Sequence, residues 1–283
     1  MMLTSEFQHA AEPLFNDGRV DVVEWSFDMG WGRILSPWLR AILTNYSDRG
    51  MLLGHGVSYS ALDAGETDRQ RIWLSRLAQE VAQFKYAHIS EHFGFMGGGN
   101  FHFAAPLPVP RTPTSVAIGR QRLRELADVA RVPVGLENLA FAFNIHDVQQ
   151  QGPFLEELLQ PVDGFLLLDL HNLYCQSCNF DVELLTLLEA YPIHRVRELH
   201  VSGGSWSEHP PGSGQRVRRD THDDLVPEEV FAALPEVLRR CPNVQAVILE
   251  RMDGTIDITN AAAVGGFRDD FRRLRSIVSE VQR

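Results

Sequence analysis

Short runs of aliphatic and β-branched residues alternate along the chain with longer amphipathic segments. Several runs are apolar almost throughout, such as Phe165-Leu166-Leu167-Leu168, which is typical of parallel strands buried on both faces. The pattern predicts seven strands, at residues 20–25, 51–55, 86–90, 132–137, 164–169, 196–201 and 244–250.

Amphipathic segments with a helical period separate these strands, at residues 37–45, 67–84, 116–130, 153–159, 182–190, 227–240 and 260–281. Regular alternation of strand and helix predicts right-handed crossovers and a parallel sheet. We therefore expect an α/β fold, a TIM-type (β/α)8 barrel, as a single domain over residues 1–283. Its eighth strand is hidden, irregular or replaced by an insertion. No glycine-rich fingerprint follows the first strand, which disfavours a dinucleotide-binding open sheet.

Two segments, residues 93–113 and 202–225, are too long and irregular to be simple connections. Each begins where a predicted strand ends. In a barrel such segments form long loops at the C-terminal face of the strands, where binding residues are commonly found.

Charge and cysteine content narrow the classes of partner. The chain has 26 basic and 37 acidic residues, a formal charge of −11, which disfavours nucleic-acid binding. No apolar run approaches the roughly 20 residues of a membrane helix, and no signal peptide is visible. Cysteine occurs only at positions 175, 178 and 241, too sparsely for a disulfide framework. We expect a cytoplasmic protein without a nucleic-acid or membrane partner.

Potential metal ligands close or follow every predicted strand. The C-terminal strand ends of a barrel meet at one face, so these side chains are expected to converge. They are Glu24, His55, Glu91-His92, Glu137-Asn138, Asp169 with His171-Asn172, His200 and Glu250, and the loop after His200 adds Asp220 and His222.

Nitrogen and oxygen ligands without cysteine suit iron, manganese or zinc. The set exceeds what one catalytic ion takes, which favours two or three metals with bridging carboxylates. Without metal, clustered acids repel one another and their pKa values rise. Glu24 either binds a metal directly or hydrogen-bonds a ligand. His88 is expected to be structural and to face away from the ligands, and Cys175 with Cys178 is expected to be a structural pair rather than a redox or zinc motif.

Eight short motifs strengthen this interpretation. In chain order they are Gly54-His55-Gly56-Val57-Ser58, Ser90-Glu91-His92-Phe93, Pro106-Leu107-Pro108, Leu136-Glu137-Asn138, the segment from Leu168 to Tyr174, Glu198-Leu199-His200, Asp220-Thr221-His222-Asp223 and Ile248-Leu249-Glu250. In these motifs and their order the sequence resembles the multinuclear non-haem iron-dependent oxidases. That family includes the enzymes of methanobactin oxazolone formation and of cysteine β-carbon excision in the thiaglutamate pathway.

The resemblance implies a barrel that holds two or three iron ions in mixed Fe(II)/Fe(III) states and uses dioxygen as co-substrate. Its substrate would be a cysteine of a ribosomally synthesised precursor peptide, delivered with a small leader-recognising partner protein in a heterodimer. The residue departing from the family pattern is His171, an extra ligand or a substrate contact; Glu24 and His171 are the candidate catalytic residues. The implied metal ligands are His55, His92, Glu137, Asp169, Asn172, His200, Asp220, His222 and Glu250.

Two other classes fit the bare ligand set. Barrels of the xylose-isomerase and endonuclease-four type also gather His, Asp and Glu around divalent ions, for isomerisation or hydrolysis. The charge of −11 disfavours the DNA-cleaving type. A sugar isomerase needs a lysine beside the metals, whereas Lys85, the only lysine, precedes a predicted strand. The remaining class is a non-catalytic barrel that binds metal or peptide.

Overall fold

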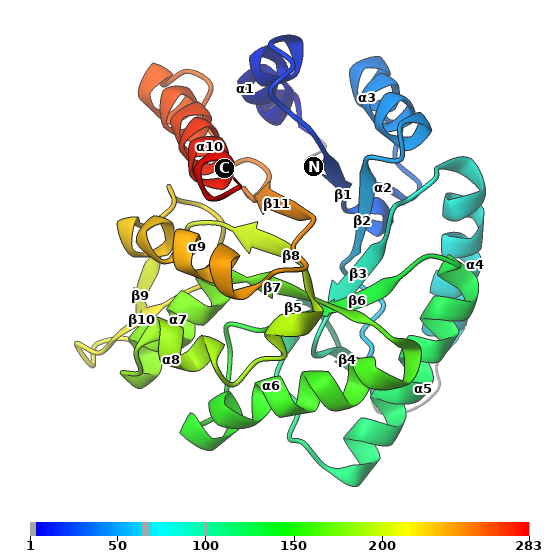
Figure 1. The fold of residues 1–283 in the computed structure, drawn as a ribbon, viewed down its shortest axis with the longest axis vertical. Helices are drawn as coiled ribbons and strands as arrows, with labels where there is room; N and C mark the ends of the chain where they lie inside the picture. The colour runs from blue at the N-terminus through cyan, green and yellow to red at the C-terminus, as the bar shows by residue number, and fades with distance from the viewer. Residues whose placement is uncertain (1–3, 64–67, 99–100, 283) are drawn as a thin grey trace.

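The computed structural model describes residues 4–63, 68–98 and 101–282, and its centre is a parallel sheet curved into a nearly closed barrel (Figure 1). Seven strands form the sheet, in the order β1 (Val23–Trp25), β2 (Leu52–Gly56), β3 (Ile89–His92), β6 (Val134–Glu137), β7 (Phe165–Asp169), β8 (Val196–Val201) and β11 (Ala246–Leu249). All neighbouring strands pair in parallel. Each predicted strand overlaps one of these seven, although β2 extends one residue and β3 two residues beyond the predicted ends, and the expected α/β barrel class is confirmed.

Helices cover the outside of the sheet, because their amphipathic faces pack against the buried strands. Ser36 caps α3 and Thr112 caps α5, each followed by a proline in the first turn. The outer helices are α3 (Pro37–Asp48), α4 (Asp68–Gln83), α5 (Pro113–Ala130), α6 (Ile145–Leu159), α7 (Leu170–Phe180), α8 (Leu184–Leu188), α9 (Glu228–Arg240) and α10 (Ala261–Val281). A short 3-10 helix follows α6 at η1 (Gln160–Val162), and another follows α8 at η2 (Ile193–Arg195).

A helix takes the place of the expected eighth strand. Within the described residues no pairing joins β1 to β11, and α1 (Ser5–Asn16) lies beside this seam, between α10 and α3 (Figure 1). Leu14 of α1 packs with Val264 and Phe267 of α10 in a separate apolar cluster. A small space of about 90 Å³ lined by α1, β1 and β11 shows that α1 faces both edge strands. Apolar burial under α1 therefore closes the barrel where backbone pairing stops.

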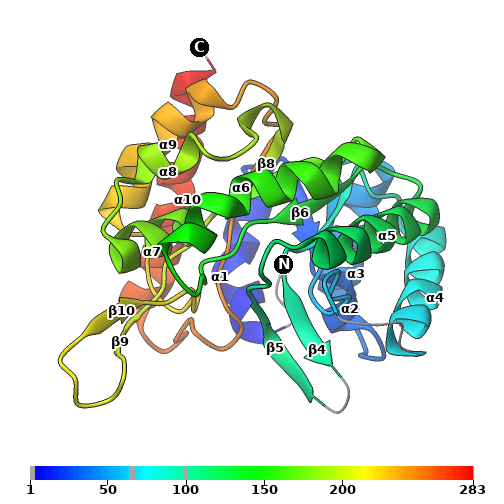
Figure 2. The same ribbon diagram turned by 90° about the horizontal axis from the view of Figure 1, so that it is seen from below.

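Both long segments form antiparallel hairpins rather than irregular loops. β4 (Phe95–Gly98) pairs with β5 (Phe101–Leu107), and β9 (Trp206–Glu208) pairs with β10 (Arg216–Arg218). Figure 2 shows the two hairpins projecting on the same side of the molecule. They leave the barrel after β3 and β8, so they flank the face formed by the C-terminal strand ends.

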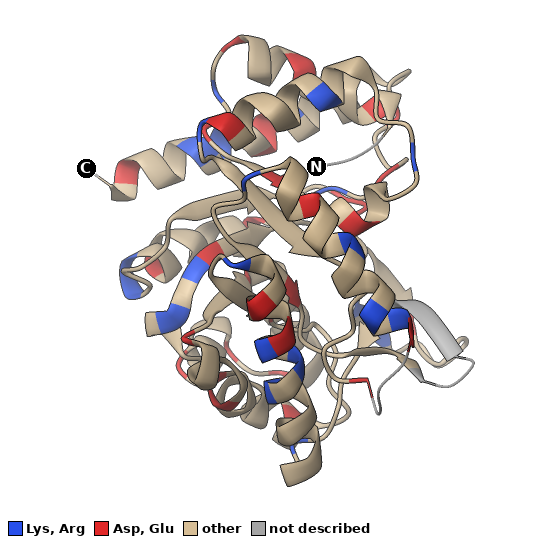
Figure 3. Cartoon of the chain, turned by 90° about the vertical axis from the view of Figure 1, so that its right-hand side faces the viewer, with Lys and Arg blue, Asp and Glu red and all other residues tan. Residues whose placement is uncertain are grey.

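Two further helices follow strands directly. α2 (Phe27–Gly30) comes after β1, and α7 begins at the residue after Asp169. The outer helices carry acidic and basic residues interspersed, without a single basic face in the view of Figure 3. None of the helices in the described part of the chain is long and apolar enough to cross a membrane.

Candidate metal centre

Side chains from the strand ends gather inside the barrel mouth in two groups that share Glu137, and a third group, Glu24 and Glu198 with His200, shares His200 with the second. His55, His92 and Glu137 form one group, and Glu137, Asp169, His200 and Glu250 form the other, with the ligand atoms of each group within 4.8 Å of one another. One carboxylate common to two groups is the arrangement of a bridging ligand.

The first group comes from β2, β3 and β6. The Nε2 atoms of His55 and His92 each lie 3.4 Å from Oε2 of Glu137. The other ring nitrogen of His55, Nδ1, lies 2.8 Å from Oγ of Ser90, which in turn donates to the carbonyl of Gly54 at 3.3 Å. These two hydrogen bonds in series make Nδ1 of His55 the protonated nitrogen, and Nε2 is then the atom that can bind a metal.

Asp169 joins the end of β7 to the start of α7. Its Oδ1 accepts the Asn172 backbone N–H at 2.6 Å and so caps the helix, while its Oδ2 has no hydrogen-bond partner. The backbone N–H of Asp169 donates to Oδ1 of Asn138 at 2.7 Å, which holds the strand end in place. Asn172 donates from Nδ2 to the Asn138 carbonyl at 2.9 Å, and its Oδ1 has no hydrogen-bond partner. One oxygen of each side chain is therefore left for a cation.

His200 of β8 stands between two carboxylates. Its Nδ1 lies 3.0 Å from Oε2 of Glu250 and 3.9 Å from Oε1 of Glu137. Its Nε2 lies 3.0 Å from Oε2 of Glu24. Glu24 thus meets His200 on the nitrogen that faces away from Glu137, the position of a residue that orients a metal-binding histidine.

The segment after β10 supplies Asp220 and His222. Oδ1 of Asp220 lies 2.6 Å from Nε2 of His222, which is 3.7 Å from Oε2 of Glu250. The backbone of His222 is left-handed, with φ at 49°, an uncommon conformation for a residue with a side chain. Its carbonyl accepts the backbone N–H of Met252 at 2.8 Å. The chain therefore bends sharply to bring the imidazole to the group of Glu250.

Burial and crowding shift the charges of these residues. Burial raises the pKa of Glu137 to about 7, and burial together with nearby Asp220 raises that of Asp169 well above its usual value. Burial opposes protonation of His200, yet Glu24 and Glu250 raise its pKa well above the usual value. Without metal, therefore, the site holds protons to balance its carboxylates.

Orphaned polar atoms test whether the residues fit a metal. Such atoms are rare in folded proteins, because an unpaired buried polar atom costs free energy. In the described part of the chain, Oδ2 of Asp169 and Oδ1 of Asn172 are buried with neither a hydrogen bond nor an ion pair. Buried atoms of four further candidate ligands lack a hydrogen bond and face only ion-pair partners: His92, His200, His222 and Glu250. The residues fit a cluster of cations that takes the place of the missing hydrogen-bond partners.

A buried pair beneath this centre, His88 and Glu198, is not among the ligands predicted from the sequence. His88 lies with its Nε2 2.8 Å from Oε2 of Glu198, and both are buried. The expectation that His88 faces away from the ligands is wrong. His88, which directly precedes β3, and Ser90 and His92 of β3 are every second residue and face the same side, the interior of the barrel. The same period of two, applied backwards from His200, would have found Glu198. Nothing in the local sequence indicates Arg218, whose approach to His171 depends on the β9–β10 hairpin.

His171 and the cysteines lie on α7. His171 is fully buried, with Nδ1 3.4 Å from Oδ1 of Asp220 and Nε2 3.3 Å from Nη2 of Arg218. Cys175 is buried with Sγ 3.9 Å from both ring nitrogens of His171. Cys175 and Cys178 are free thiols, and the groups that can hold a metal in the described residues contain neither.

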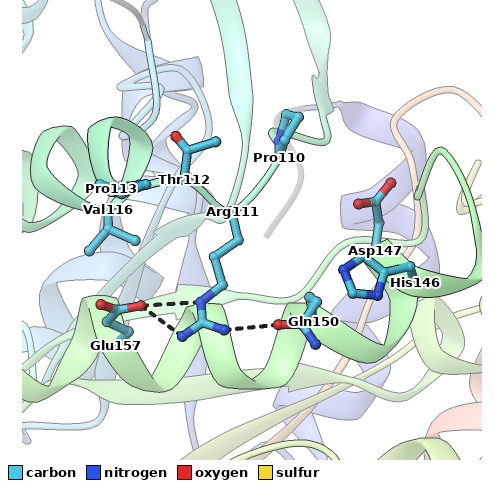
Figure 4. A pocket seen from close by; sticks show the side chains of 9 residues that line it. All are labelled: Pro110, Arg111, Thr112, Pro113, Val116, His146, Asp147, Gln150 and Glu157. Carbon is cyan, nitrogen blue, oxygen red and sulfur yellow. Dashed lines mark hydrogen bonds and ion pairs between the residues drawn. The ribbon is translucent and has the colours of Figure 1, made fainter.

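A cavity of about 470 Å³ lies away from this centre, between the start of α5 and the face of α6 (Figure 4). Its central Arg111 donates to Oε2 of Glu157 from Nε at 3.2 Å and from Nη2 at 3.1 Å, and to Oε1 of Gln150 at 2.8 Å. Because the guanidinium is already paired, and no lining residue belongs to the two ligand groups, the metal centre is the stronger functional candidate.

A parallel barrel with His, Asp and Glu clustered at the C-terminal strand ends defines a class of metal-dependent barrel enzymes. Residues 31–263 match the family model described as RiPP precursor modification enzyme MbnB/TglH/ChrH, and the chain belongs to this family. The resemblance inferred from the sequence motifs is thereby confirmed.

Curated relatives match much of the chain, and solved structures share its fold. The chain is 29% identical over 236 residues to a "UPF0276 protein" of Caulobacter vibrioides, covering 83% of this chain and 79% of the relative. It is 32% identical over 180 residues to a "UPF0276 protein" of Shewanella oneidensis, covering 64% of this chain and 61% of the relative. An L-ribulose 3-epimerase structure superposes with a TM-score of 0.57 at 16% identity, covering 99% of this chain and 93% of the epimerase. A D-psicose 3-epimerase structure from Clostridium cellulolyticum superposes with a TM-score of 0.55 at 13% identity, covering 99% of this chain and 94% of the epimerase. At these identities the two structures show the fold alone.

Proposed function

We propose that this chain is a dioxygen-dependent, multinuclear non-haem iron oxidase that oxidatively rearranges a cysteine of a ribosomally synthesised precursor peptide. The observation that carries the proposal is Glu137, shared by two groups of ligand atoms in a member of a family of precursor-modifying enzymes. A single catalytic ion would be bound by one of these groups, so a second group of ligands around the same carboxylate favours a second ion.

The ligands divide by position. His55, His92 and Glu137 would hold one iron, and Glu137, Asp169, His200 and Glu250 a second. Asp220 and His222 lie together beside Glu250 and would hold a third. Asn172, whose Nδ2 lies 3.4 Å from Oε1 of Glu137, would supply its Oδ1, which has no hydrogen-bond partner. The set combines imidazole nitrogen with carboxylate oxygen, a donor set that suits iron.

The open side of the centre indicates where a substrate enters. The side chains of His92, His222 and Glu250 are each 18% exposed and that of Asp220 is 21% exposed. His200 is fully buried and Glu137 nearly so. A cysteine side chain would therefore approach from the side of His92 and His222, while the rear of the cluster stays shielded from water.

Bound iron supplies one-electron chemistry with dioxygen and the Lewis acidity that favours a thiolate over a thiol. The protein's own residues set up that chemistry. Glu24 and Ser90 orient the rings of His200 and His55. Glu137, whose pKa of about 7 lies near neutrality, releases its proton when cations enter.

A peptide substrate also fits the surface around the mouth. Large apolar side chains are exposed on the segments that follow several barrel strands: Phe141 and Phe143 after β6, Trp206 in β9 and Leu225 after β8, and Met252 and Ile258 after β11. Exposed apolar side chains grouped at one face are typical of interaction surfaces. A small partner protein that recognises the leader of the peptide, bound as a heterodimer, completes the proposal and rests on the family resemblance.

The decisive activity experiment supplies anaerobically iron-loaded protein with its cysteine-bearing precursor peptide and the partner protein. Oxygen uptake that depends on the peptide, with a mass change confined to a cysteine-containing fragment, is the expected result. Glu137→Gln removes the shared carboxylate charge and should abolish both, whereas Glu157→Gln, on α6 outside the cluster, should abolish neither. Unchanged peptide mass and no oxygen uptake by the iron-loaded wild-type protein would refute the proposed function.

A sugar isomerase, the alternative function, would need a lysine beside the metals. Lys85 precedes β3, at the end of the sheet opposite the ligand groups, and lines a cavity with Tyr86 and Arg131. The sole lysine of the chain is therefore not beside the metal centre. The likeness to the epimerase structures is one of fold. The lysine expected of a sugar isomerase does not lie at this site.

A further inference from the structure

Arg218 is a buried cation that reaches the metal centre from the β9–β10 hairpin. Its Nε and Nη2 lie 3.4 and 3.3 Å from Nε2 of His171. No carboxylate among the described residues lies within 4.0 Å of its guanidinium. A buried charge normally has an acidic partner, so the pairing of Arg218 with a histidine calls for an explanation.

Hydrogen-bond chemistry fixes the state of His171. A guanidinium only donates, so Nε2 of His171 must accept and the ring proton must lie on Nδ1. Nδ1 is 3.4 Å from Oδ1 of Asp220, a candidate metal ligand. Nε2 thus faces Arg218 and Nδ1 faces Asp220, while the Cys175 sulfur lies farther off, 3.9 Å from each ring nitrogen.

We propose that Arg218 is a positioning residue that holds the His171 ring with Nδ1 toward Asp220, so that His171 orients the Asp220 carboxylate toward the metals. This assigns His171 neither of the roles left open by the sequence, metal ligand or substrate contact. The inference rests on the proposed function to the extent that Asp220 is a metal ligand.

The surroundings of Arg218 hold it in place for this role. Asn179 of α7 bonds the Arg218 backbone twice, accepting from its N–H at 2.8 Å and donating to its carbonyl at 2.9 Å. The guanidinium carbon lies 5.4 Å from the ring centroid of Tyr174 and 5.5 Å from that of Trp206. Cation–π contacts on two rings offset part of the cost of burying the charge.

A glycine makes the approach of the loop to His171 feasible. A Cβ at Gly204 would lie 2.2 Å from the carbonyl oxygen of Arg219 and 2.9 Å from Cε1 of His171. Any side chain there would push the loop away from the ring. The hairpin, through Trp206 and its cross-strand partner Arg218, therefore helps to set the position of a ligand that the barrel strands do not carry.

The test measures metal binding rather than turnover. Arg218→Met keeps an aliphatic stem of similar length but removes the donors, and we expect iron affinity to fall about 10- to 100-fold, as for other residues that orient metal ligands. The matched control is Arg216→Met, since Arg216 also lies over Trp206, at 5.0 Å, two residues along the same strand. The control should load iron like the wild type.

Two further measurements separate positioning from a merely structural role. In the zinc-loaded wild type, ¹⁵N chemical shifts of His171 should report a protonated Nδ1 and an unprotonated Nε2, and Arg218→Met should mix the two tautomers. His171→Phe should lose affinity by a similar factor, and the double variant should lose no more than either single one. His171→Phe also provides the test if Arg218→Met does not fold.

The outcomes divide cleanly. Wild-type iron affinity in folded Arg218→Met or His171→Phe, a protonated Nε2 in the wild type, or additive losses in the double variant would each overturn the inference. A wild-type chain that binds no iron would overturn the proposed function along with it. Normal loading of the wild type with normal loading of the variants overturns this inference alone.

Discussion

At the scale of single residues, Ser90 and Glu24 set the orientation of two histidines of the centre. Ser90 accepts from Nδ1 of His55, and Glu24 accepts from Nε2 of His200. Each fixes which nitrogen of a histidine faces Glu137. The sequence indicates the candidate ligands because they close strands, but it leaves the role of Glu24 open, since only the three-dimensional structure places it against His200.

Ser90→Ala tests this layer. Without the hydroxyl, Nδ1 of His55 loses its acceptor, and we expect iron affinity of the His55, His92 and Glu137 group to fall about tenfold. The free energy of unfolding of the metal-free protein should fall by about 1 kcal/mol. Chelator competition and denaturant titration measure the two effects, with exposed Ser276→Ala as the control. Wild-type iron affinity in Ser90→Ala would mean that His55 needs no orienting partner.

Protonation of His92 predicts a pH effect on the metal-free protein. Burial opposes the charge, but Glu91 and Glu137 raise the pKa of His92 from 6.5 to about 9. Because the folded value is the higher one, this stabilisation is complete below pH 6.5 and is lost as pH rises toward 9. Thermal melting of metal-free protein should therefore show a falling Tm across this window.

Cations replace those protons in the loaded protein, so its Tm should change less over the same window. Iron affinity should rise with pH as His92 loses its proton. A metal-free Tm that rises between pH 6.5 and 9 would contradict the assigned direction of the shift.

At the scale of elements, the strand pattern was predictable and the connections were not. Continuous apolar runs such as β7 mark buried parallel strands, and all seven were found from the sequence. Helix α7 was missed because Asp169 both ends a strand and caps a helix, so no turn residues separate the two elements. The hairpins were missed because their pairing is antiparallel and lies outside the barrel sheet.

The double role of Asp169 leads to a matched pair of variants. Asn caps helices about as well as Asp, so Asp169→Asn should retain the stability of α7 and lose metal affinity. Asp169→Ala should lose metal affinity too, and in addition about 1 kcal/mol of the cap. Denaturant unfolding of the metal-free variants, with iron counts after loading, distinguishes the two. Equal metal content in wild type and Asp169→Asn would remove Asp169 from the ligand set.

At the scale of the whole molecule, the barrel brings together side chains from residue 55 to residue 250. Sequence reasoning predicted this convergence because parallel strands end at one face. It could not place the seam between β1 and β11, where α1 covers the sheet edge through apolar contacts that leave no strand signature. Nor could it find contacts such as Arg218 with His171, which arise only when a hairpin folds back over α7.

We propose that Glu137 joins two metal sites into one multinuclear centre. Mössbauer and electron paramagnetic resonance spectra of anaerobically reconstituted protein, with an iron count per chain, test it most directly. We predict at least two irons per chain with exchange-coupled signals that disappear in Glu137→Gln. One uncoupled iron per chain, or coupling that survives Glu137→Gln unchanged, would contradict the account.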